Sequence, residues 1–187
     1  MSSRDALLAL IREVAYERRR VVLKSGRVSE FYIDCRNVAL HPLGVRYCGE
    51  VLSALLAEGP EFVAVAGPSI GADPLVAAIA FASGRWPALM VRPEAKEHGT
   101  GRRVEGLRNV PAGSAVAVVE DVLTTGGSAL KTVAALREVG LVPVRVVALV
   151  DRQEGGREAI AAAGLAVSVA FTRAEIAPEL PADEPAS

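Results

Sequence analysis

The chain has 187 residues, of which 51% are hydrophobic and 23% carry a charge. This length is sufficient for one well-buried core and too short for two ordinary domains. The formal net charge of -1, without a helix-length block of Lys and Arg, argues against a nucleic-acid-binding protein. Apolar stretches such as Pro74–Ala82 reach about half of a membrane span, and Met1–Ala15 carries charges where a signal peptide would be apolar, so we expect a cytoplasmic protein without membrane contact.

The first 60 residues contain signals for two helices and two short strands. Asp5–Glu17 has apolar residues at the spacing of one helical face, with Ser2 or Ser3 available as an N-cap. Two strands around a polar turn at 24–27, followed by a second helix, are expected at Arg20–Leu23, Glu30–Cys35 and Gly44–Ala57. We predict that residues 1–60 form a small hood of helices and strands.

From Phe62 onward, apolar runs alternate with helical segments. The predicted strands are Phe62–Ala66, Ala88–Val91, Ala115–Val119, Val144–Val150 and Ala166–Phe171. The predicted helices are Asp73–Ala82, Ser128–Val139 and Arg157–Ala163. Continuous apolar strands interleaved with helices indicate an α/β fold with a mainly parallel sheet flanked by helices. Ligands of such sheets bind beyond the carboxyl ends of the strands.

Two stretches fall outside this alternation. Pro93–Pro111 contains basic side chains and glycines without helical or strand periodicity, so we expect a long mobile loop. The tail from Pro178 is rich in Pro and acidic residues, and we expect it to be frayed. The sequence therefore predicts one domain, with an α/β core over 61–175 and a tail over 176–187. Cys35 and Cys48 have no spacing typical of a zinc site or a redox pair, so we expect two reduced thiols without a chemical role.

The most informative segment is Val116–Ser128, in which an apolar strand leads to two acids and then to a turn rich in hydroxyls and glycines. Glu120 and Asp121 can accept hydrogen bonds from neighbouring ribose hydroxyls. The turn 124–128 offers backbone N–H groups and a helix N-terminus, which suit a phosphate. The plain alternative is a solvated acidic turn before a capped helix.

This ordered run resembles the binding motif for phosphoribosyl pyrophosphate (PRPP) of type I phosphoribosyltransferases. The resemblance assigns PRPP contacts to Glu120, Asp121, Val122, Leu123, Thr124, Thr125, Gly126, Gly127 and Ser128. It also implies Mg²⁺ as the cofactor. We expect PRPP and water to hold the ion, without a direct protein ligand unless Asp121 is one.

The segment 23–32 looks like the N-terminal signature of orotate phosphoribosyltransferases. It implies that Lys24, Phe31 and Tyr32 contact orotate. The alternative makes Lys24 a solvated turn residue and Phe31 a core residue.

The segment 92–101 resembles the catalytic loop of the same family, whose basic side chains close over the pyrophosphate. The resemblance implies that Arg92, Lys96 and His98 carry that role here, for PRPP binding and, with Asp121, for catalysis. The family usually has a second basic residue where this chain has Pro93, so charge is lost at that point. In the family's dimer this loop reaches the neighbouring subunit, which implies a homodimer that shares the loop 92–103.

The segment 150–156 is similar to the orotate-contacting segment of the family. Arg152 is a planar, two-pronged donor that suits the carboxylate of orotate, and Thr124 joins it in the predicted orotate set. The alternative interpretation makes Arg152 a surface residue in a turn. The segment 66–74, between a strand and a helix, could line the pyrophosphate, although Gly-Pro and Asp-Pro also mark ordinary turns.

Together these segments predict an orotate phosphoribosyltransferase, which makes orotidine 5'-monophosphate and pyrophosphate in pyrimidine biosynthesis. The alternatives are a phosphoribosyltransferase for another nucleobase and a PRPP-binding regulatory protein that controls nucleic-acid binding. The loop cations argue against a catalytically inactive scaffold.

Overall fold

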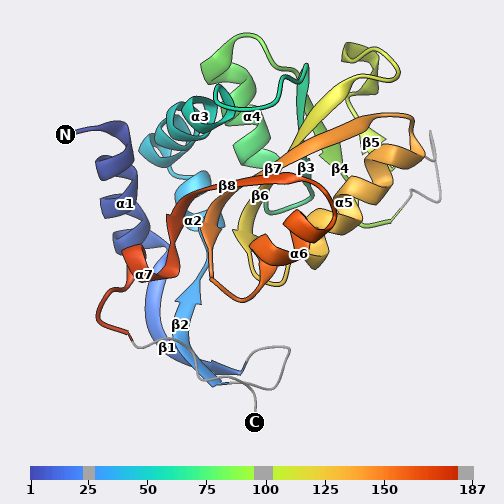
Figure 1. Ribbon diagram of the computed structural model, residues 1–187. Helices are drawn as coiled ribbons and strands as arrows, with labels where there is room; N and C mark the ends of the chain where they lie inside the picture. The colour runs from blue at the N-terminus through green and yellow to red at the C-terminus, as the bar shows by residue number, and fades with distance from the viewer. Residues whose placement is uncertain (23–27, 95–102, 181–187) are drawn as a thin grey trace.

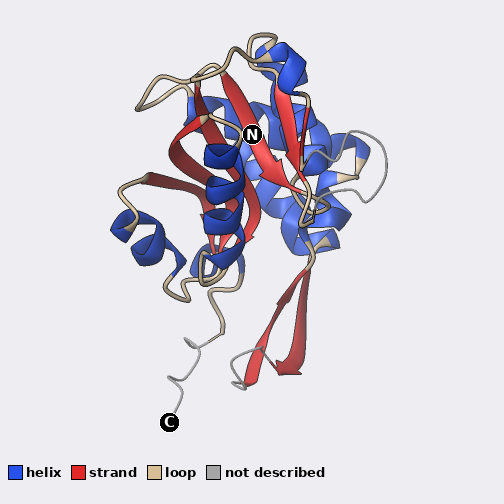
Figure 2. Cartoon of the chain, turned by 90° about the vertical axis from the view of Figure 1, so that its right-hand side faces the viewer, coloured by secondary structure: helices blue, strands red, loops and turns tan. Residues whose placement is uncertain are grey.

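The computed structural model describes residues 1–22, 28–94 and 103–180, and its centre is a six-stranded sheet with helices on both faces (Figure 1). A separate two-stranded hairpin projects from this body (Figure 2). The N-terminal elements are α1 (Ser3–Val14), β1 (Tyr16–Val22), β2 (Val28–Ile33), α2 (Cys35–Ala39) and α3 (Pro42–Leu56). The remaining elements are β3 (Ala64–Pro68), α4 (Asp73–Ser83), β4 (Ala88–Val91), β5 (Val104–Glu105), the 3-10 helix η1 (Leu107–Asn109), β6 (Ala115–Leu123), α5 (Gly127–Glu138), β7 (Val142–Asp151), α6 (Gly156–Ala162), β8 (Ala166–Thr172) and α7 (Arg173–Ile176).

The six strands lie in the order β5-β4-β3-β6-β7-β8. All neighbours pair in parallel except β4 and β5 at one edge, which confirms the predicted mainly parallel sheet. On β6, Ala117 and Val119 pack into the core on the side of α3 and α4, whereas Val116 and Val118 pack on the side of α5 and α6. Residues 115–119 of this strand are all apolar because both of its faces are buried there.

The N-terminal boundaries differ from the prediction. The capping box between Ser2 and Asp5 starts α1, but the helix ends at Val14, where the prediction had Glu17. Tyr16 already belongs to β1, where it pairs with Ile33 of β2. Its ring also stacks on Phe31 of the hairpin, with the ring centroids 5.3 Å apart. The sequence analysis missed α2 entirely, because five residues are too few to show a helical period.

Two predicted irregular segments contain regular structure. Within Pro93–Pro111, β5 and η1 form because Val104 is buried against the sheet and pairs with Val91. The expected loop is therefore wrong for these elements, and 95–102 lie outside the described residues. The tail prediction is wrong for 178–180, where Leu180 packs into the core, and 181–187 also lie outside the described residues.

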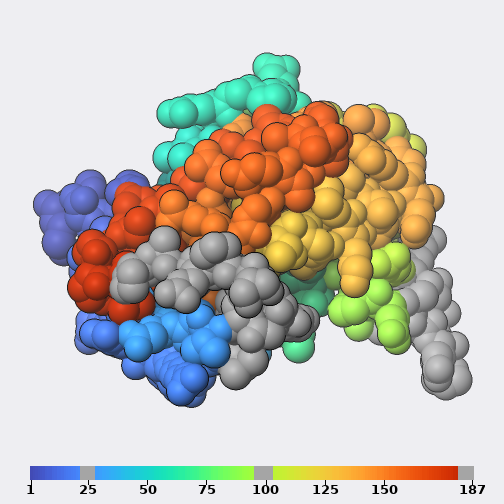
Figure 3. Space-filling model, turned by 60° about the horizontal axis from the view of Figure 1, so that its bottom comes forward, coloured from blue at the N-terminus to red at the C-terminus, as the bar shows by residue number. Residues whose placement is uncertain are grey.

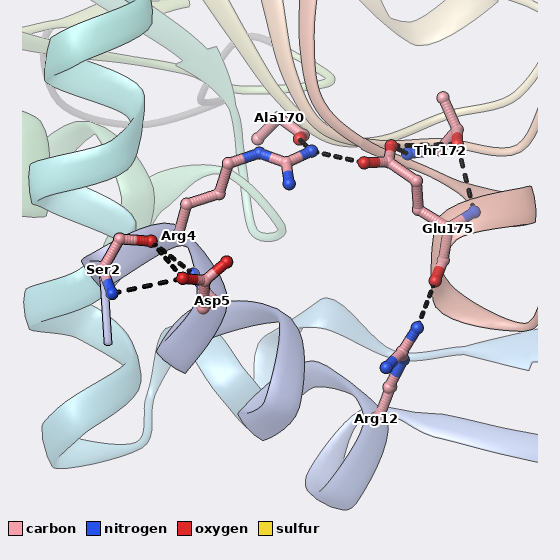
Figure 4. A network of polar contacts seen from close by, with 7 residues as sticks. All are labelled: Ser2, Arg4, Asp5, Arg12, Ala170, Thr172 and Glu175. Carbon is pink, nitrogen blue, oxygen red and sulfur yellow. Dashed lines mark hydrogen bonds and ion pairs between the residues drawn. The ribbon is translucent and has the colours of Figure 1, made fainter.

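The short helix α7 is held by the first helix of the chain (Figure 4). Arg4 donates to Ala170 O at 2.9 Å and pairs with the Glu175 carboxylate, and Arg12 donates to Glu175 O at 2.6 Å. Glu175 in turn forms a capping box with Thr172. Four residues do not form a stable helix alone, so these contacts fix α7 in place. Figure 3 shows α7 (red) against the N-terminal elements (blue).

Among the described residues, no helix combines the length and apolar character needed to cross a lipid bilayer.

Candidate active site

The carboxyl ends of β3 and β6 border one pocket, whose volume is about 420 Å³. Its lining residues are Tyr32, Ile33, Asp34, Cys35, Arg36, Pro68, Ser69, Ile70, Gly71, Glu120, Asp121, Val122 and Ser128. The pocket thus brings together five of the residues that the sequence analysis assigned to a ligand: Tyr32, Glu120, Asp121, Val122 and Ser128.

Glu120 lies on β6 itself, because the strand continues to Leu123 and does not end at the predicted Val119. Only 4% of Glu120 is exposed. Its Oε1 accepts a hydrogen bond from Ser128 Oγ at 3.3 Å, and its buried Oε2 has no partner among the described residues. Burial raises the pKa of Glu120 to about 8, and the neighbouring carboxylate of Asp121 acts in the same direction. The raised pKa favours the protonated form of Glu120 at neutral pH.

The Asp121 carboxylate lies against the loop that follows β3. Its Oδ1 accepts a hydrogen bond from the Val122 N–H at 2.9 Å. A Cβ atom at Gly71 would come within 2.3 Å of Asp121 Oδ2, so only glycine leaves the carboxylate in its position. The sequence signal for this loop was weak, and the structure places Ser69, Ile70 and Gly71 in the pocket wall.

The turn after β6 leads directly into α5. Gly126 is the N-cap with φ +82°, and no side chain caps the amides of the first turn. Those N–H groups are the kind of donors that bind a phosphate at a helix N-terminus. Leu123 is 1% exposed, so it can serve a ligand only through its backbone, and Thr124 does not line the pocket.

The turn after β7 packs on the turn after β6. A Cβ atom at Gly156 would come within 2.5 Å of Thr124 O, and one at Gly126 would come within 3.2 Å of Gly156 O. Glycine at both positions therefore allows the two backbones to touch. The predicted PRPP turn and the predicted orotate turn form one contiguous unit.

Arg152 and Phe31 are not among the residues that line the pocket. The Phe31 side chain is fully buried, which favours the core alternative over direct stacking on a ligand. Arg152 Nε pairs with Glu154 Oε1 at 2.7 Å, and its Nη2 is 3.4 Å from Phe31 O. Its guanidinium carbon lies 5.5 Å from the Phe31 ring centroid. Arg152 is thus mostly buried and fixed in orientation.

The predicted catalytic cations are only partly described. Arg92 follows β4 outside the pocket, and its Nε donates to Glu105 Oε1 at 3.2 Å. Lys24, Lys96 and His98 lie outside the described residues, so their roles stay predictions.

The sequence analysis missed one group in the pocket wall. Arg36 donates to both carboxylate oxygens of Asp34, at 2.8 Å each, and both residues line the pocket. Asp34 also caps α2 by accepting the Arg36 N–H. The Asp-x-Arg spacing before a helix was the only available signal.

Comparisons with known proteins point to one family. The family described as Phosphoribosyl transferase domain matches residues 37–164. An orotate phosphoribosyltransferase of Sorangium cellulosum is 48% identical over 184 residues, which cover 96% of each chain. Another, of Nostoc sp., is 44% identical over 173 residues, which cover 90% of this chain and 82% of the relative. The crystal structure of Mycobacterium tuberculosis orotate phosphoribosyltransferase in complex with PRPP has a TM-score of 0.79 and 36% identity, and it covers 94% of this chain and 99% of that one.

The raised pKa of Glu120 predicts a pH-dependent stability. Unfolded, Glu120 loses its proton near 4.5, and folded it does so near 8. The folded chain therefore binds the extra proton between these values, and the stability that Glu120 contributes is complete below the lower pKa and is lost as the pH rises through the upper one. We expect Glu120→Gln, which stays neutral, to gain stability over the wild type by up to about 1.4 kcal/mol per pH unit in this window.

Urea unfolding at several pH values measures this difference. Glu158→Gln, on an exposed helix position, is the control and should show no such trend. A stability difference between Glu120→Gln and the wild type that does not change with pH would contradict the raised pKa.

Proposed function

This chain belongs to the orotate phosphoribosyltransferases of the type I phosphoribosyltransferase family, and from that premise we propose how its residues divide the reaction. The enzyme transfers the 5-phosphoribosyl group of PRPP to orotate in pyrimidine biosynthesis. One observation supports the assignment of residues most strongly: Glu120 and Asp121 line one pocket with the loop 69–71 and with Ser128 at the start of α5.

The ribose phosphate binds at the carboxyl end of β6. Asp121 and Glu120 hydrogen-bond the ribose hydroxyls, and a ribose hydroxyl supplies the partner that Glu120 Oε2 lacks. The amides and hydroxyls of 124–128 bind the 5-phosphate. The loop 69–71, on the opposite wall, lies against the pyrophosphate.

Mg²⁺ fits this site as an ion held mainly by the substrate. The described residues contain no group of three or more His, Cys, Asp or Glu side chains that could hold a metal. Asp121 and Glu120 offer carboxylate oxygens, the ligand type that Mg²⁺ prefers, and Mg²⁺ commonly keeps several waters. When bound, the ion neutralises charge on the pyrophosphate. Of the two, Asp121 is the candidate protein ligand.

Orotate binds on the side of the β7 turn. Arg152 donates to the orotate carboxylate, because its guanidinium carries five N–H donors and its contacts with described residues, at Nε and Nη2, leave others available. Tyr32, Thr124 and Lys24 complete the base site. Phe31 supports Arg152, because its buried ring lies against the Arg152 guanidinium.

The chemical step is a displacement at the anomeric carbon. A ring nitrogen of orotate forms the new bond to this carbon while the bond to the pyrophosphate oxygen breaks, and the ribose gains positive charge in the transition state. The Asp121 carboxylate lies near this charge, and Glu120 helps to orient the ribose. Lys96 and His98 neutralise or protonate the leaving pyrophosphate, and Arg92 neutralises its charge. Positioning and electrostatics account for the rate without a covalent enzyme intermediate.

We further propose a homodimer in which the segment 92–103 of one subunit serves the site of the other. A cytoplasmic location and the division into 1–60, 61–175 and 176–187 also remain predictions.

The identity of the base is tested by pyrophosphate release. With Mg²⁺ and PRPP, orotate should react, whereas uracil, hypoxanthine and adenine should not. Arg152→Ala should lower kcat/KM for orotate by about tenfold to a hundredfold, the usual range for a lost charge-assisted hydrogen bond, and leave the KM for PRPP within about twofold. Turnover of uracil at a rate similar to orotate would refute the role of Arg152.

The contact between Gly71 and Asp121 predicts a variant that loses PRPP binding without losing stability. In Gly71→Ala the new methyl group displaces the Asp121 carboxylate, a short side chain that can rotate away, so the KM for PRPP should rise by about tenfold or more while the melting temperature changes little. Adding Gly71→Ala to Asp121→Asn should have little further effect, because both act on one carboxylate. Fully additive effects would show that Gly71 acts elsewhere.

Lys96 should affect turnover more than binding. We expect Lys96→Ala to lower kcat by on the order of a hundredfold or more, since general acid and electrostatic groups typically contribute that much, with a small change in the KM for orotate. A rise in the KM for orotate as large as the fall in kcat would contradict this role.

Mixing Lys96→Ala with Asp121→Asn tests whether the loop is shared. If subunits exchange and the loop acts across the dimer, a random mixture should recover about a quarter of wild-type activity, because half of the dimers are mixed and each has one intact site. No recovery in a mixture with demonstrated exchange would place Lys96 in its own subunit's site.

A further inference from the structure

Gln153, directly after Arg152, has an unusual backbone conformation. It is the only glutamine in the sequence, and among the described residues it is the only non-glycine with a positive φ, at 61°. L-residues with a side chain rarely adopt this region, so surrounding contacts must hold Gln153 there.

Two hydrogen bonds hold it. The Gln153 N–H donates to Asp151 Oδ1 at 2.8 Å, which closes the turn after β7. Its side-chain Oε1 accepts the N–H of Ala174 at 3.2 Å. Ala174 lies in the first turn of α7, where backbone N–H groups have no partner within the helix. The positive φ therefore directs the Gln153 side chain to a different element of the fold.

The element that receives Gln153 is itself fixed. The network in Figure 4 ties α7 to α1 through Arg4, Arg12 and the Glu175 capping box. The first residue of α7, Arg173, is 8% exposed, and its guanidinium carbon lies 5.5 Å from the centroid of the Phe31 ring. The Arg152 guanidinium lies at the same distance from that ring. One buried ring thus contacts both arginines.

Arg152 lies between two anchored neighbours. Asp151 belongs to β7 and is 1% exposed, and Gln153 is bound to α7. The Arg152 N–H donates to Leu123 O at 2.9 Å, on the β6 strand that carries the two acids. Removal of the Gln153 anchor would leave the unfavourable conformation at 153 without its compensating contact, and the peptide that carries Arg152 would relax.

We propose that Gln153 is a positioning residue for orotate recognition: it holds the Arg152 guanidinium at the base site by binding the turn to α7. This inference rests on the proposed contact between Arg152 and the orotate carboxylate. Gln153 itself is not a catalytic residue, because it acts through Arg152.

Three variants test the hydrogen bond against the backbone conformation. Gln153→Met has nearly the same shape and no acceptor, Gln153→Glu keeps the acceptor at the same reach, and Gln153→Gly favours positive φ but has no acceptor. We expect the Met and Gly variants to raise the KM for orotate by about three- to tenfold, as for one lost hydrogen bond, with the KM for PRPP and kcat within about twofold. The Glu variant should stay near the wild type.

The outcomes separate this inference from the proposed function. An unchanged KM for orotate in Arg152→Ala overturns the role of Arg152 and this inference with it. A raised KM in Arg152→Ala together with wild-type values in Gln153→Met and Gln153→Gly overturns the positioning role alone. If the KM for PRPP rises as much as the KM for orotate, or if the Glu variant is as impaired as the Met variant, Gln153 has a general structural role and the positioning role is overturned.

Discussion

A carboxyl group buried at the end of an apolar strand is the constraint on which the site depends. Glu120 has 4% of its surface exposed, and burial disfavours its charged form. The chain tolerates this because Glu120 keeps its proton, accepts one hydrogen bond from Ser128, and lies where a sugar hydroxyl would supply the next donor. Strand β6 is held on both edges by β3 and β7, so the position of the carboxyl group is set by the most buried part of the sheet.

Close backbone contact surrounds the two acids with fixed walls. Gly71 brings the loop after β3 against the Asp121 carboxylate, and Gly126 and Gly156 let the turns after β6 and β7 touch. At each position a side chain would meet a neighbouring atom within about 3.2 Å or less. The loop after β3 therefore borders the pocket beside the two acids, and a backbone-lined loop suits phosphates, because backbone N–H groups bind them without a charged side chain.

The sequence predicted the features that depend on the spacing of apolar residues and on the order of motifs. It failed for features that tertiary contacts determine. The parallel sheet and the 116–128 motif follow from continuous apolar runs that precede polar turns. The end of β6 was placed four residues early because Glu120 and Asp121 look like turn residues, although the ladder continues until Leu123 pairs with Asp151. Elements of two to five residues such as β5, α2 and α7 have no readable period. The Gln153 contact with α7 joins residues far apart in sequence, which no local pattern indicates. The sequence left Phe31 open between a ligand contact and a core residue, and its burial favours the core.

Two adjoining turns carry side chains of opposite charge. In the proposed assignment, the turn region of β6 contributes the acids that contact the ribose, and the turn of β7 contributes a guanidinium for an anionic base. Because Gly126 and Gly156 place these turns in contact, and because Arg152 N–H binds Leu123 O, a shift of one turn must move the other. If the sugar and the base bind as proposed, one connected pair of turns positions both, and this is the condition under which alignment of the ring nitrogen with the anomeric carbon lowers the barrier.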